Sequence, residues 1–262
     1  MRTVLTIAGS DSCGVGGIQG DIKTISAHGL YAMSAITSMT AQNTTGVYDI
    51  QESTPKFLGR QIDCVFNDIS PDAVKIGMVS NPDLIEVIAE KIRKYHVRNV
   101  VLDTNIVSNS GRRLVGTGAE RIILKKLLPL ATVILPSLPE AEVISGMSIR
   151  GIEDLGAAAG LISAKYGVKG IFFKEGHRIT EKGDMLFVDE NIRWLEGDYE
   201  GDHTSIGKGG ALSAAIACNL AMGKDITESV KLAKDYITKA VENRLELGKG
   251  RNPVNHLVSF TV

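Results

Sequence analysis

The sequence predicts an α/β fold, a three-layer α/β/α sandwich around a mostly parallel central sheet. Short apolar runs rich in β-branched residues alternate with helical patterns along most of the chain. Runs that are apolar on both faces are typical of strands buried inside a parallel sheet. Repeated alternation of strands and helices favours right-handed crossovers with helices on both faces. Glycine is abundant at 28 residues and proline is scarce at 7, which indicates tight turns between regular elements.

Six apolar runs are the clearest strand candidates. Between them, the segment Pro82–Tyr95 carries Leu84, Ile88 and Ile92 on one stripe at helical spacing, and Ile152–Tyr166 repeats the pattern. Both segments are therefore expected to be amphipathic helices that pack on the sheet. The expected strands are Val4–Ala8, Ala35–Met39, Ala73–Ile76, Asn99–Leu102, Thr132–Leu135 and Gly170–Phe173.

The pattern changes toward the C-terminus. Met185–Val188 and Ile192–Leu195 are expected to form a short hairpin, and a polar loop over Glu196–Ser205 follows it. Two helices, over Gly210–Met222 and Ile226–Leu245, are expected to come last. No repeat, low-complexity tract or linker interrupts the sequence, so we expect one domain over the whole chain, residues 1–262.

Composition limits the class of function. The net charge is −1, so no basic excess attracts nucleic acid or an anionic membrane. The three cysteines, Cys13, Cys64 and Cys218, form no CxxC pair, which argues against a zinc site and favours a reducing compartment. No run approaches the roughly 18 apolar residues of a membrane span, and the first apolar stretch is too short for a signal peptide. A cytoplasmic location is therefore expected.

The first glycine cluster, Gly9–Gly17, follows the first strand and precedes a helix that begins near Ile18. A ligand crevice is expected outside the carboxyl end of such a strand, although an ordinary glycine-rich turn would look the same. The cluster is not a dinucleotide fingerprint, because the third glycine would have to stand at position 19, which is Gln19. It is not a Walker A loop either, since no Gly-Lys-Ser/Thr follows.

The second cluster, Ile206–Gly210, opens a helical segment of small residues. The N–H groups and the positive dipole end of a helix N-terminus form a ready anion site, and Lys208 would add a charge. The alternative is a glycine-rich helix start that binds nothing.

Nine short segments keep their order and spacing from one end of the chain to the other. The segments are Leu5–Ser12, Gly17–Gln19, Asp21–Thr24, Ala41–Val47, Lys75–Met78, Leu138–Glu142, Gly207–Gly209, Leu212–Ala215 and Leu247–Gly250. Together they resemble the hydroxymethylpyrimidine/phosphomethylpyrimidine kinase family. The resemblance implies a ribokinase-like fold and transfer of the ATP γ-phosphoryl group to the hydroxymethyl group of the pyrimidine, and then to its monophosphate, in thiamine biosynthesis.

For the pyrimidine, the resemblance implies contacts at the ends of the strands. Gln42 would hydrogen-bond the edge of the ring, and Met78 would pack on its face. Taken alone, Met78 is more often simply a core residue, Gln42 is compatible with the cap of a turn, and Asp21 is compatible with the solvated face of the first helix. The substrate positions implied are Gly9, Gly16, Asp21, Gln42, Met78 and Asn105.

For ATP and Mg²⁺, the resemblance implies a second set. Glu140, through its water shell, and Asp103 would hold Mg²⁺. Lys174 and His177 match a family KGGH stretch near the nucleotide, where Lys234 is also expected. The turn after Ile206 would form the anion hole. The catalytic positions implied are therefore Gly207, Lys208, Gly209, Gly210 and Asp21.

The departures from the family pattern gather at this same site. The family's catalytic cysteine is replaced by Gly210, which cannot accept a proton, and loss of a positioned base costs about 10²- to 10⁴-fold in rate. Lys208 replaces the threonine of the anion hole. Thr104 and Asn105 replace the proline and valine of a DPVM motif, Ser137 replaces the asparagine of the N-x-x-E metal motif, and Glu175 replaces a glycine of KGGH.

Three functions are compatible with these residues. A slower kinase is favoured, because phosphoryl transfer depends mainly on positioning and charge stabilisation; Asp21 or Asp103 would then take the proton. A non-catalytic pyrimidine-binding protein would keep Gln42, Gly9 and Met78 but not the base. A pyridoxal or pyridoxine kinase would act on another hydroxymethyl-bearing heterocycle. The resemblance also implies a homodimer paired through edges of the sheet.

Overall fold

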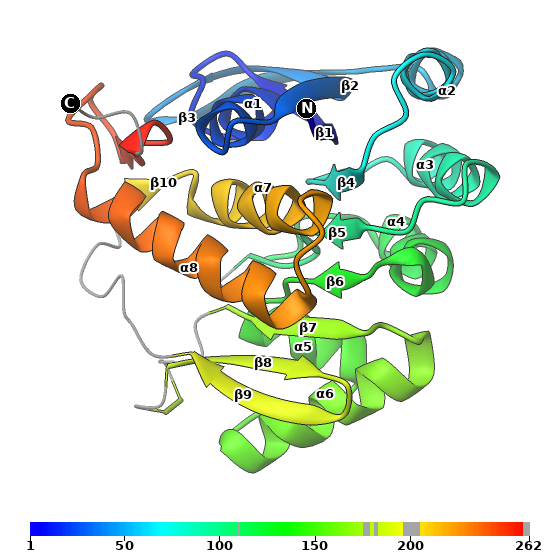
Figure 1. Cartoon of the computed structure of the whole chain (residues 1–262), viewed down its shortest axis with the longest axis vertical. Coiled ribbons are helices and arrows are strands. Elements are labelled where there is room, and N and C mark those ends of the chain that lie inside the picture. Colours follow the sequence, from blue (N-terminus) through cyan, green and yellow to red (C-terminus); the bar gives the residue numbers. More distant parts are fainter. Residues whose placement is uncertain (109–110, 175–178, 181–182, 196–204, 259–262) are drawn as a thin grey trace.

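The structure, a computed structural model, describes residues 1–108, 111–174, 179–180, 183–195 and 205–258. Within these residues, the centre is a nine-stranded sheet of order β3-β2-β1-β4-β5-β6-β7-β8-β9 (Figure 1). The six strands from β2 to β7 in this order pair in parallel, whereas β3 at one edge and β8 and β9 at the other pair antiparallel. The strands are β1 Thr3–Asp11, β2 Tyr31–Asn43, β3 Gly46–Glu52, β4 Ala73–Ile76, β5 Val100–Leu102, β6 Val133–Ile134, β7 Gly170–Phe173, β8 Asp184–Val188 and β9 Asn191–Leu195.

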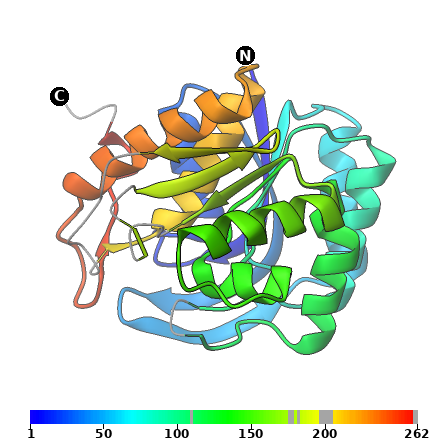
Figure 2. The same cartoon turned by 90° about the horizontal axis from the view of Figure 1, so that it is seen from below.

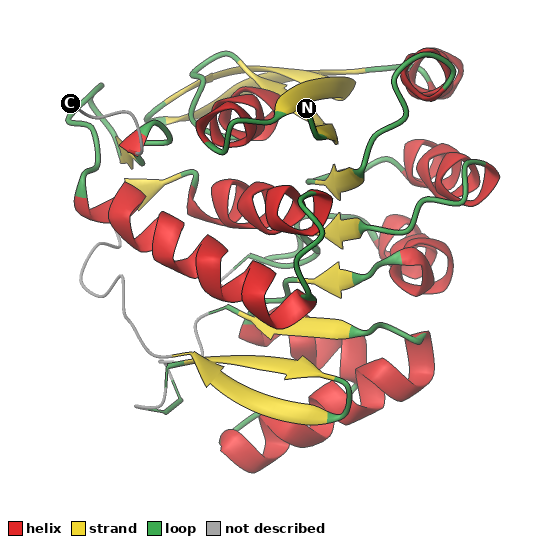
Figure 3. Cartoon of the chain, viewed as in Figure 1, coloured by secondary structure: helices red, strands yellow, loops and turns green. Residues whose placement is uncertain are grey.

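Helices cover both faces of this sheet (Figures 2 and 3). α1, α7 and α8 pack into one apolar core, and α2 to α6 pack into the other. A short π-helix, η1, and a 3-10 turn, η2, lie between α4 and β6. The helices are α1 Gly17–Ala27, α2 Pro55–Phe66, α3 Pro82–Lys94, α4 Thr117–Ile122, η1 Ile123–Leu127, η2 Leu128–Leu130, α5 Leu138–Ser145, α6 Ile152–Tyr166, α7 Lys208–Ala221 and α8 Ile226–Glu242.

The two cores explain why the strands are apolar on both faces. On β1, Leu5 and Ile7 point into the core under α2 to α6, and Val4 points into the core under α7 and α8. The helix α7 is buried on all sides from Ala211 to Ala221. Its small residues let it lie close to the sheet while α8 covers it. The predicted three-layer sandwich is therefore confirmed.

The central elements match their predicted positions. All six predicted strands are present, as are the helices α3 and α6 and the hairpin β8–β9. α7 begins at Lys208, two residues before the predicted start, and α8 ends at Glu242, three residues before the predicted end. Of the predicted loop Glu196–Ser205, only Ser205 lies within the described residues; it belongs to β10, Ser205–Ile206, which pairs with β11, Asn252–Pro253.

The hairpin of β2 and β3 was not predicted from the sequence. β2 continues four residues past the predicted Met39, to Asn43, and β3 returns antiparallel beside it. Six of the seven residues of β3 are exposed, so no apolar alternation marks the strand. Among the described helices, none is both long and apolar enough to span a membrane.

A carboxylate on α2 ties α2 to α3. Asp63 accepts hydrogen bonds from Lys91 Nζ at 2.6 Å, Lys94 Nζ at 3.0 Å and Tyr95 Oη at 2.6 Å, and the ring of Tyr95 stacks on Phe66 at 4.4 Å. Partial desolvation acts to raise the pKa of Asp63, but these hydrogen bonds outweigh it and lower the pKa from 3.8 to about 2.

Replacing Asp63 with Asn is expected to lower the free energy of unfolding at pH 7 by about 1 kcal/mol, a value reduced for solvent screening of this partly exposed group. A depressed carboxyl pKa stabilises the fold above the unfolded-state pKa, and the contribution is lost as pH falls through about 2. Urea unfolding at several pH values measures this. A difference between Asp63→Asn and the wild type that stays constant down to pH 2 would contradict it.

Candidate active site

The N-terminal turn of α7 brings together residues from several sheet-end loops. A Cβ placed on Gly210 would lie 3.6 Å from Asp21 Oδ1, and one on Gly209 would lie 3.5 Å from Asp103 Oδ2 and 4.0 Å from Lys174 Nζ. Asp103 follows β5 and Lys174 follows β7, so both stand at the carboxyl edge of the parallel strands, where ligands bind in open α/β sheets. The predicted catalytic turn thus lies between two predicted carboxylates.

Asp21 forms a buried ion pair with Lys75, on β4. Lys75 Nζ donates to Asp21 Oδ1 at 2.9 Å and to Oδ2 at 2.8 Å, and Thr6 Oγ1 donates to Oδ2 at 2.5 Å. Neither charged side chain is more than 2% exposed. The alternative of a solvated helix face for Asp21 is therefore wrong. Lys75 belongs to one of the segments of the family resemblance, but no role was predicted for it; a lysine inside an otherwise apolar strand was the available signal.

The protonation of the two carboxylates differs. Burial raises the pKa of Asp21, and the charge of Asp103 raises it further, while Lys75 acts in the opposite direction. Burial also acts to raise the pKa of Asp103, but the charges of Lys174, 2.7 Å away, and Lys75 outweigh it, so the pKa of Asp103 lies below its ordinary value. Asp103 is therefore ionised at neutral pH, and Asp21 is the more basic carboxylate.

The start of α7 requires glycine. Gly207 has φ +97° and caps the helix without a side chain, and a Cβ there would lie 2.7 Å from the carbonyl oxygen of Val15. The first amides of an α-helix have no intrahelical acceptor, and the positive dipole end favours an anion beside them. This geometry favours an anion beside Gly207, Lys208, Gly209 and Gly210, and anion binding there stays a prediction.

The first glycine cluster has a different organisation. The carboxylate of Asp11 accepts hydrogen bonds from the amides of Cys13 at 2.8 Å, Val15 at 3.2 Å and Gly16 at 2.8 Å. A Cβ on Gly17, where φ is +52°, would overlap the carbonyl oxygen of Gly9. These amides bind a carboxylate of the chain itself, so the loop forms a wall of the site and does not cradle a phosphate.

The remaining substrate positions lie around this wall. The backbone of Gln42 forms two hydrogen bonds with the side chain of Ser12. The backbone amide of Gln42 donates to Ser12 Oγ at 2.8 Å, and Ser12 Oγ donates to the backbone carbonyl oxygen of Gln42 at 2.7 Å. Met78, after β4, is 44% exposed, so it is not a core residue. Asn105 adopts φ +44° and donates from Nδ2 to the carbonyl oxygen of Asp103 at 3.1 Å. The Cβ position of Gly9 is closest to Ser38.

Glu140, predicted to hold Mg²⁺, is enclosed by donors of its own chain. Its Oε1 accepts from the amides of Ile106 at 2.7 Å and Val107 at 3.4 Å. Its Oε2 accepts from Thr104 Oγ1 at 2.8 Å and from the amide and hydroxyl of Ser137 at 2.8 and 3.0 Å. Thr104 and Ser137 are two of the departures from the family pattern, and both contact the same carboxylate.

This arrangement limits where a metal ion fits. Glu140 is 2% exposed, and both of its oxygens already have donors. Within the described ranges, no group of three or more His, Cys, Asp or Glu side chains is placed to hold a metal. Mg²⁺ in phosphotransferases keeps several waters and takes one or two carboxylates beside the phosphates. Asp103, whose Oδ2 faces the turn of α7, fits that role, whereas a contact of Glu140 with Mg²⁺ through water stays a prediction.

Of the predicted nucleotide contacts, Lys234 bonds to the β8–β9 hairpin, and His177 lies outside the described residues. Lys234 on α8 is 3% exposed, pairs with Asp184 on β8 at 3.1 Å, and donates to the carbonyl oxygen of Leu195 at 2.7 Å. These contacts join α8 to the β8–β9 hairpin, so a nucleotide contact by Lys234 stays a prediction. His177 and Glu175 are outside the described residues.

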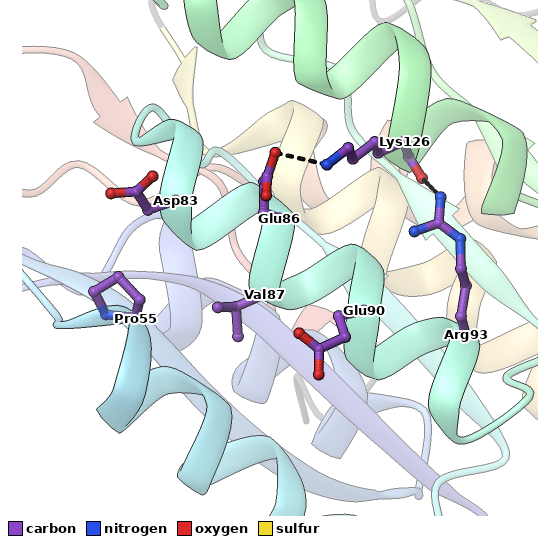
Figure 4. A pocket seen from close by; sticks show the side chains of 7 residues that line it. All are labelled: Pro55, Asp83, Glu86, Val87, Glu90, Arg93 and Lys126. Carbon is purple, nitrogen blue, oxygen red and sulfur yellow. Dashed lines mark hydrogen bonds and ion pairs between the residues drawn. The ribbon is translucent and has the colours of Figure 1, made fainter.

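A groove of about 660 Å³ runs along α3 on the opposite helical layer (Figure 4). Lys126 Nζ crosses it to Glu86 at 2.7 Å, and Arg93 donates to the carbonyl oxygen of Lys126 at 2.8 Å. None of the predicted site residues lines this groove, so it is separate from the turn of α7. Its lining residues are Pro55, Asp83, Glu86, Val87, Glu90, Arg93 and Lys126.

Comparison with known proteins identifies relatives over nearly the full length. The profile of the phosphomethylpyrimidine kinase family matches residues 11–255. A hydroxymethylpyrimidine/phosphomethylpyrimidine kinase from Rhizobium meliloti is 42% identical, over 96% of both chains. A thiamine biosynthesis bifunctional protein from Geobacter sulfurreducens is 38% identical over 98% of this chain, which spans 52% of that longer protein.

Two solved structures are similar along the same length. The crystal structure of phosphomethylpyrimidine kinase from Clostridium difficile has a TM-score of 0.84 at 42% identity, covering 92% of this chain and 100% of that one. An ADP complex of Bacillus subtilis pyridoxal kinase has a TM-score of 0.88 at 31% identity, covering 98% of this chain and 97% of that one.

Replacing Glu140 with Gln is expected to lower the free energy of unfolding by about 2–3 kcal/mol, because an amide nitrogen cannot accept the bonds that one carboxylate oxygen now accepts. Urea unfolding measures this. Glu142→Gln on the same helix is the control, since its carboxylate accepts one hydrogen bond in the described structure, from the amide of Ile149 at 2.8 Å. Equal losses in the two variants would show that Glu140 has no special structural role.

Proposed function

The chain belongs to the phosphomethylpyrimidine kinase family, and on this premise we propose that it transfers the γ-phosphoryl group of ATP to 4-amino-5-hydroxymethyl-2-methylpyrimidine and to its monophosphate in thiamine biosynthesis. The observation that carries the proposal is the turn Gly207–Gly210, which lies between the carboxylates of Asp21 and Asp103. Two features form the side of the site for a heterocycle. They are the wall of the first glycine cluster, to which Gln42 is bonded, and the exposed side chain of Met78.

The geometry supports phosphoryl transfer by positioning and charge stabilisation. The amides at the start of α7 would donate to the oxygens of the transferring group, and its positive dipole end would stabilise the charge that develops there. Lys208, in the first turn, adds a positive charge to the same end. Mg²⁺, when bound through Asp103, would neutralise charge on the phosphates. Asp103 is held in place for this by Lys174.

Asp21 is the proposed proton acceptor. Gly210 has no side chain at the position of the family's catalytic cysteine, and the Oδ1 atom of Asp21 lies closest to the space that this side chain would fill. Burial raises the pKa of Asp21, whereas the pKa of Asp103 is lowered. A base is more effective when its pKa is nearer the working pH, which favours Asp21 over Asp103.

Two alternatives each rest on one observation. A non-catalytic pyrimidine-binding protein is supported by the missing side chain at Gly210. A pyridoxal kinase is supported by the similarity to the B. subtilis pyridoxal kinase, at a TM-score of 0.88. The kinase of the pyrimidine is preferred because relatives named for that activity share 36–42% identity with the chain.

We also propose a cytoplasmic homodimer. Cys13, Cys64 and Cys218 are free thiols, which suits a reducing compartment. The edge strand β3 exposes Val47, Tyr48 and Ile50 at 53%, 70% and 58%. An open edge strand with exposed apolar side chains favours pairing with another strand, and a second copy of the chain offers the same edge.

The wild type is expected to release ADP with the hydroxymethylpyrimidine, ATP and Mg²⁺, at a rate limited by the missing side chain at Gly210. Gly210→Cys is expected to raise kcat about 10- to 100-fold, while Gly210→Ala, which adds the Cβ without the thiol, leaves it unchanged. Coupled ADP assays with the pyrimidine, its phosphate and pyridoxal measure this. No ADP above background from a folded wild type with any of these substrates would contradict the kinase, and a preference for pyridoxal would select the second alternative.

Replacing Ile50 with Lys is expected to convert the dimer to a monomer, because a charge on the edge strand opposes strand pairing. Light scattering after size exclusion gives the mass, and circular dichroism checks the fold. Phe57→Lys is the control: Phe57 is 59% exposed but lies on α2, outside the sheet edge. A wild-type chain that is monomeric at micromolar concentration would refute the dimer.

A further inference from the structure

The chain returns to the site after α8. Leu245 donates from its amide to the carbonyl oxygen of Pro253 at 2.8 Å, and β11 pairs in parallel with β10, the strand before the turn of α7. Residues 247–252 between these contacts are called the C-terminal strap. In Figure 1 this orange-to-red segment passes beside β10 and the outer end of the β2–β3 hairpin.

The strap contacts the hairpin at Thr44. The amides of Lys249 and Gly250 donate to Thr44 Oγ1 at 3.2 and 3.1 Å, and the amide of Arg251 donates to the carbonyl oxygen of Thr44 at 3.1 Å. A Cβ on Gly250 would overlap that carbonyl oxygen, and one on Gly248, where φ is +84°, would overlap Thr44 Oγ1. Only glycine allows the two backbones to approach so closely.

The other side of the strap is attached to the strand before α7. Arg251 donates from its guanidinium to the carbonyl oxygen of Ser205 at 2.6 Å. The amide of Val254 donates to the carbonyl oxygen of Ile206 at 3.2 Å. Arg251 therefore joins the hairpin, through its amide, to the residue two positions before Gly207.

These contacts link the segment that carries Gln42 to the turn of α7 in a closed succession. Ser12 in the first glycine cluster bonds to Gln42, and Thr44, two residues on, bonds to the strap. The strap bonds to Ser205, and Gly207 lies against the carbonyl oxygen of Val15, back in the first cluster. Four segments far apart in the sequence thus contact one another in succession.

We propose that Thr44, Gly250 and Arg251 are positioning residues, and that the strap fixes Gln42 at a set distance from the anion-binding turn of α7. The inference rests on the proposed function, in which Gln42 contacts the pyrimidine. The hairpin beyond Thr40 extends past the last residue of β2 that pairs with β1, and β3 is largely exposed. Its position therefore depends on the bonds of Gln42 to Ser12 and of Thr44 to the strap. A displacement of about 1 Å in a positioning group can cost about 100-fold in rate.

The first test is Gly250→Ala, which forces the strap away from Thr44. It is expected to lower kcat/KM for the hydroxymethylpyrimidine at least tenfold and to leave KM for ATP within twofold of wild type. Gly46→Ala is the matched control: it adds a methyl group to the same hairpin, with no atom within 4 Å of the new Cβ. Wild-type kcat/KM in Gly250→Ala, or an equal rise of both KM values, would overturn the proposal.

A second pair of variants separates positioning from misfolding. Thr44→Val keeps the shape and removes the hydroxyl acceptor of two amides, and is expected to weaken pyrimidine binding by calorimetry about three- to tenfold. Thr44→Ser keeps the hydroxyl and is expected to bind as the wild type does. Equal binding by Thr44→Val and wild type would overturn the role of this contact.

The same experiments distinguish this proposal from the proposed function. If the wild type neither binds nor phosphorylates the pyrimidine, the proposed function fails. The strap is then tested by hydrogen exchange, in which the amides of 42–45 and 205–209 should exchange faster in Gly250→Ala than in Gly46→Ala. Equal exchange in the two variants would overturn the positioning role, whatever the substrate.

Discussion

Two buried ion pairs beneath the first turn of α7 constrain the rest of the site. Asp21 with Lys75 and Asp103 with Lys174 bring four charges into a region that is almost fully buried. Removing such charges from water is costly, and breaking one partner of a buried pair costs about 3–5 kcal/mol, so each pair holds its strand or helix in a fixed place. The two pairs are neutral overall. The remaining positive potential at the turn comes from the helix amides and from Lys208, and a phosphoryl group requires such a potential.

The regular part of the fold was predictable because burial leaves a clear trace in the sequence. Strands such as β4 and β7, apolar on both faces, matched their predicted bounds, as did α6. The β2–β3 hairpin was not predictable, because β3 is an exposed edge without alternation. The short helix α4 was missed for a related reason: Ala119 is its one buried residue.

The site was predictable at the level of segments and not at the level of contacts. The resemblance pointed to the turn Gly207–Gly210 and to Asp21 and Asp103, which do lie together. It could not show that Asp11 occupies the amides of the first glycine cluster, or that Thr104 and Ser137 both bond to Glu140. The bond of Asp11 to Gly16 and that of Thr104 to Glu140 join residues 5 and 36 positions apart, and no local spacing encodes them. Ser137 and Glu140, in contrast, stand at the three-residue spacing of a capping box. Thr104 and Ser137 are separate departures in the sequence, but in the structure both side chains bond to the carboxylate of Glu140.

The carboxylate of Asp11 has a consequence for how the cleft separates its ligands. In a phosphate-binding glycine loop the backbone amides bind an external anion. In this loop the carboxylate of Asp11 occupies that position, 2.8 Å from the amide of Gly16. An incoming phosphate would meet like charge on this wall and favourable dipoles on the wall formed by α7. Electrostatics alone would therefore direct the polyanionic partner to one wall and leave the other to an uncharged aromatic ring, so the orientation of the two reactants is biased before any side chain recognises either of them.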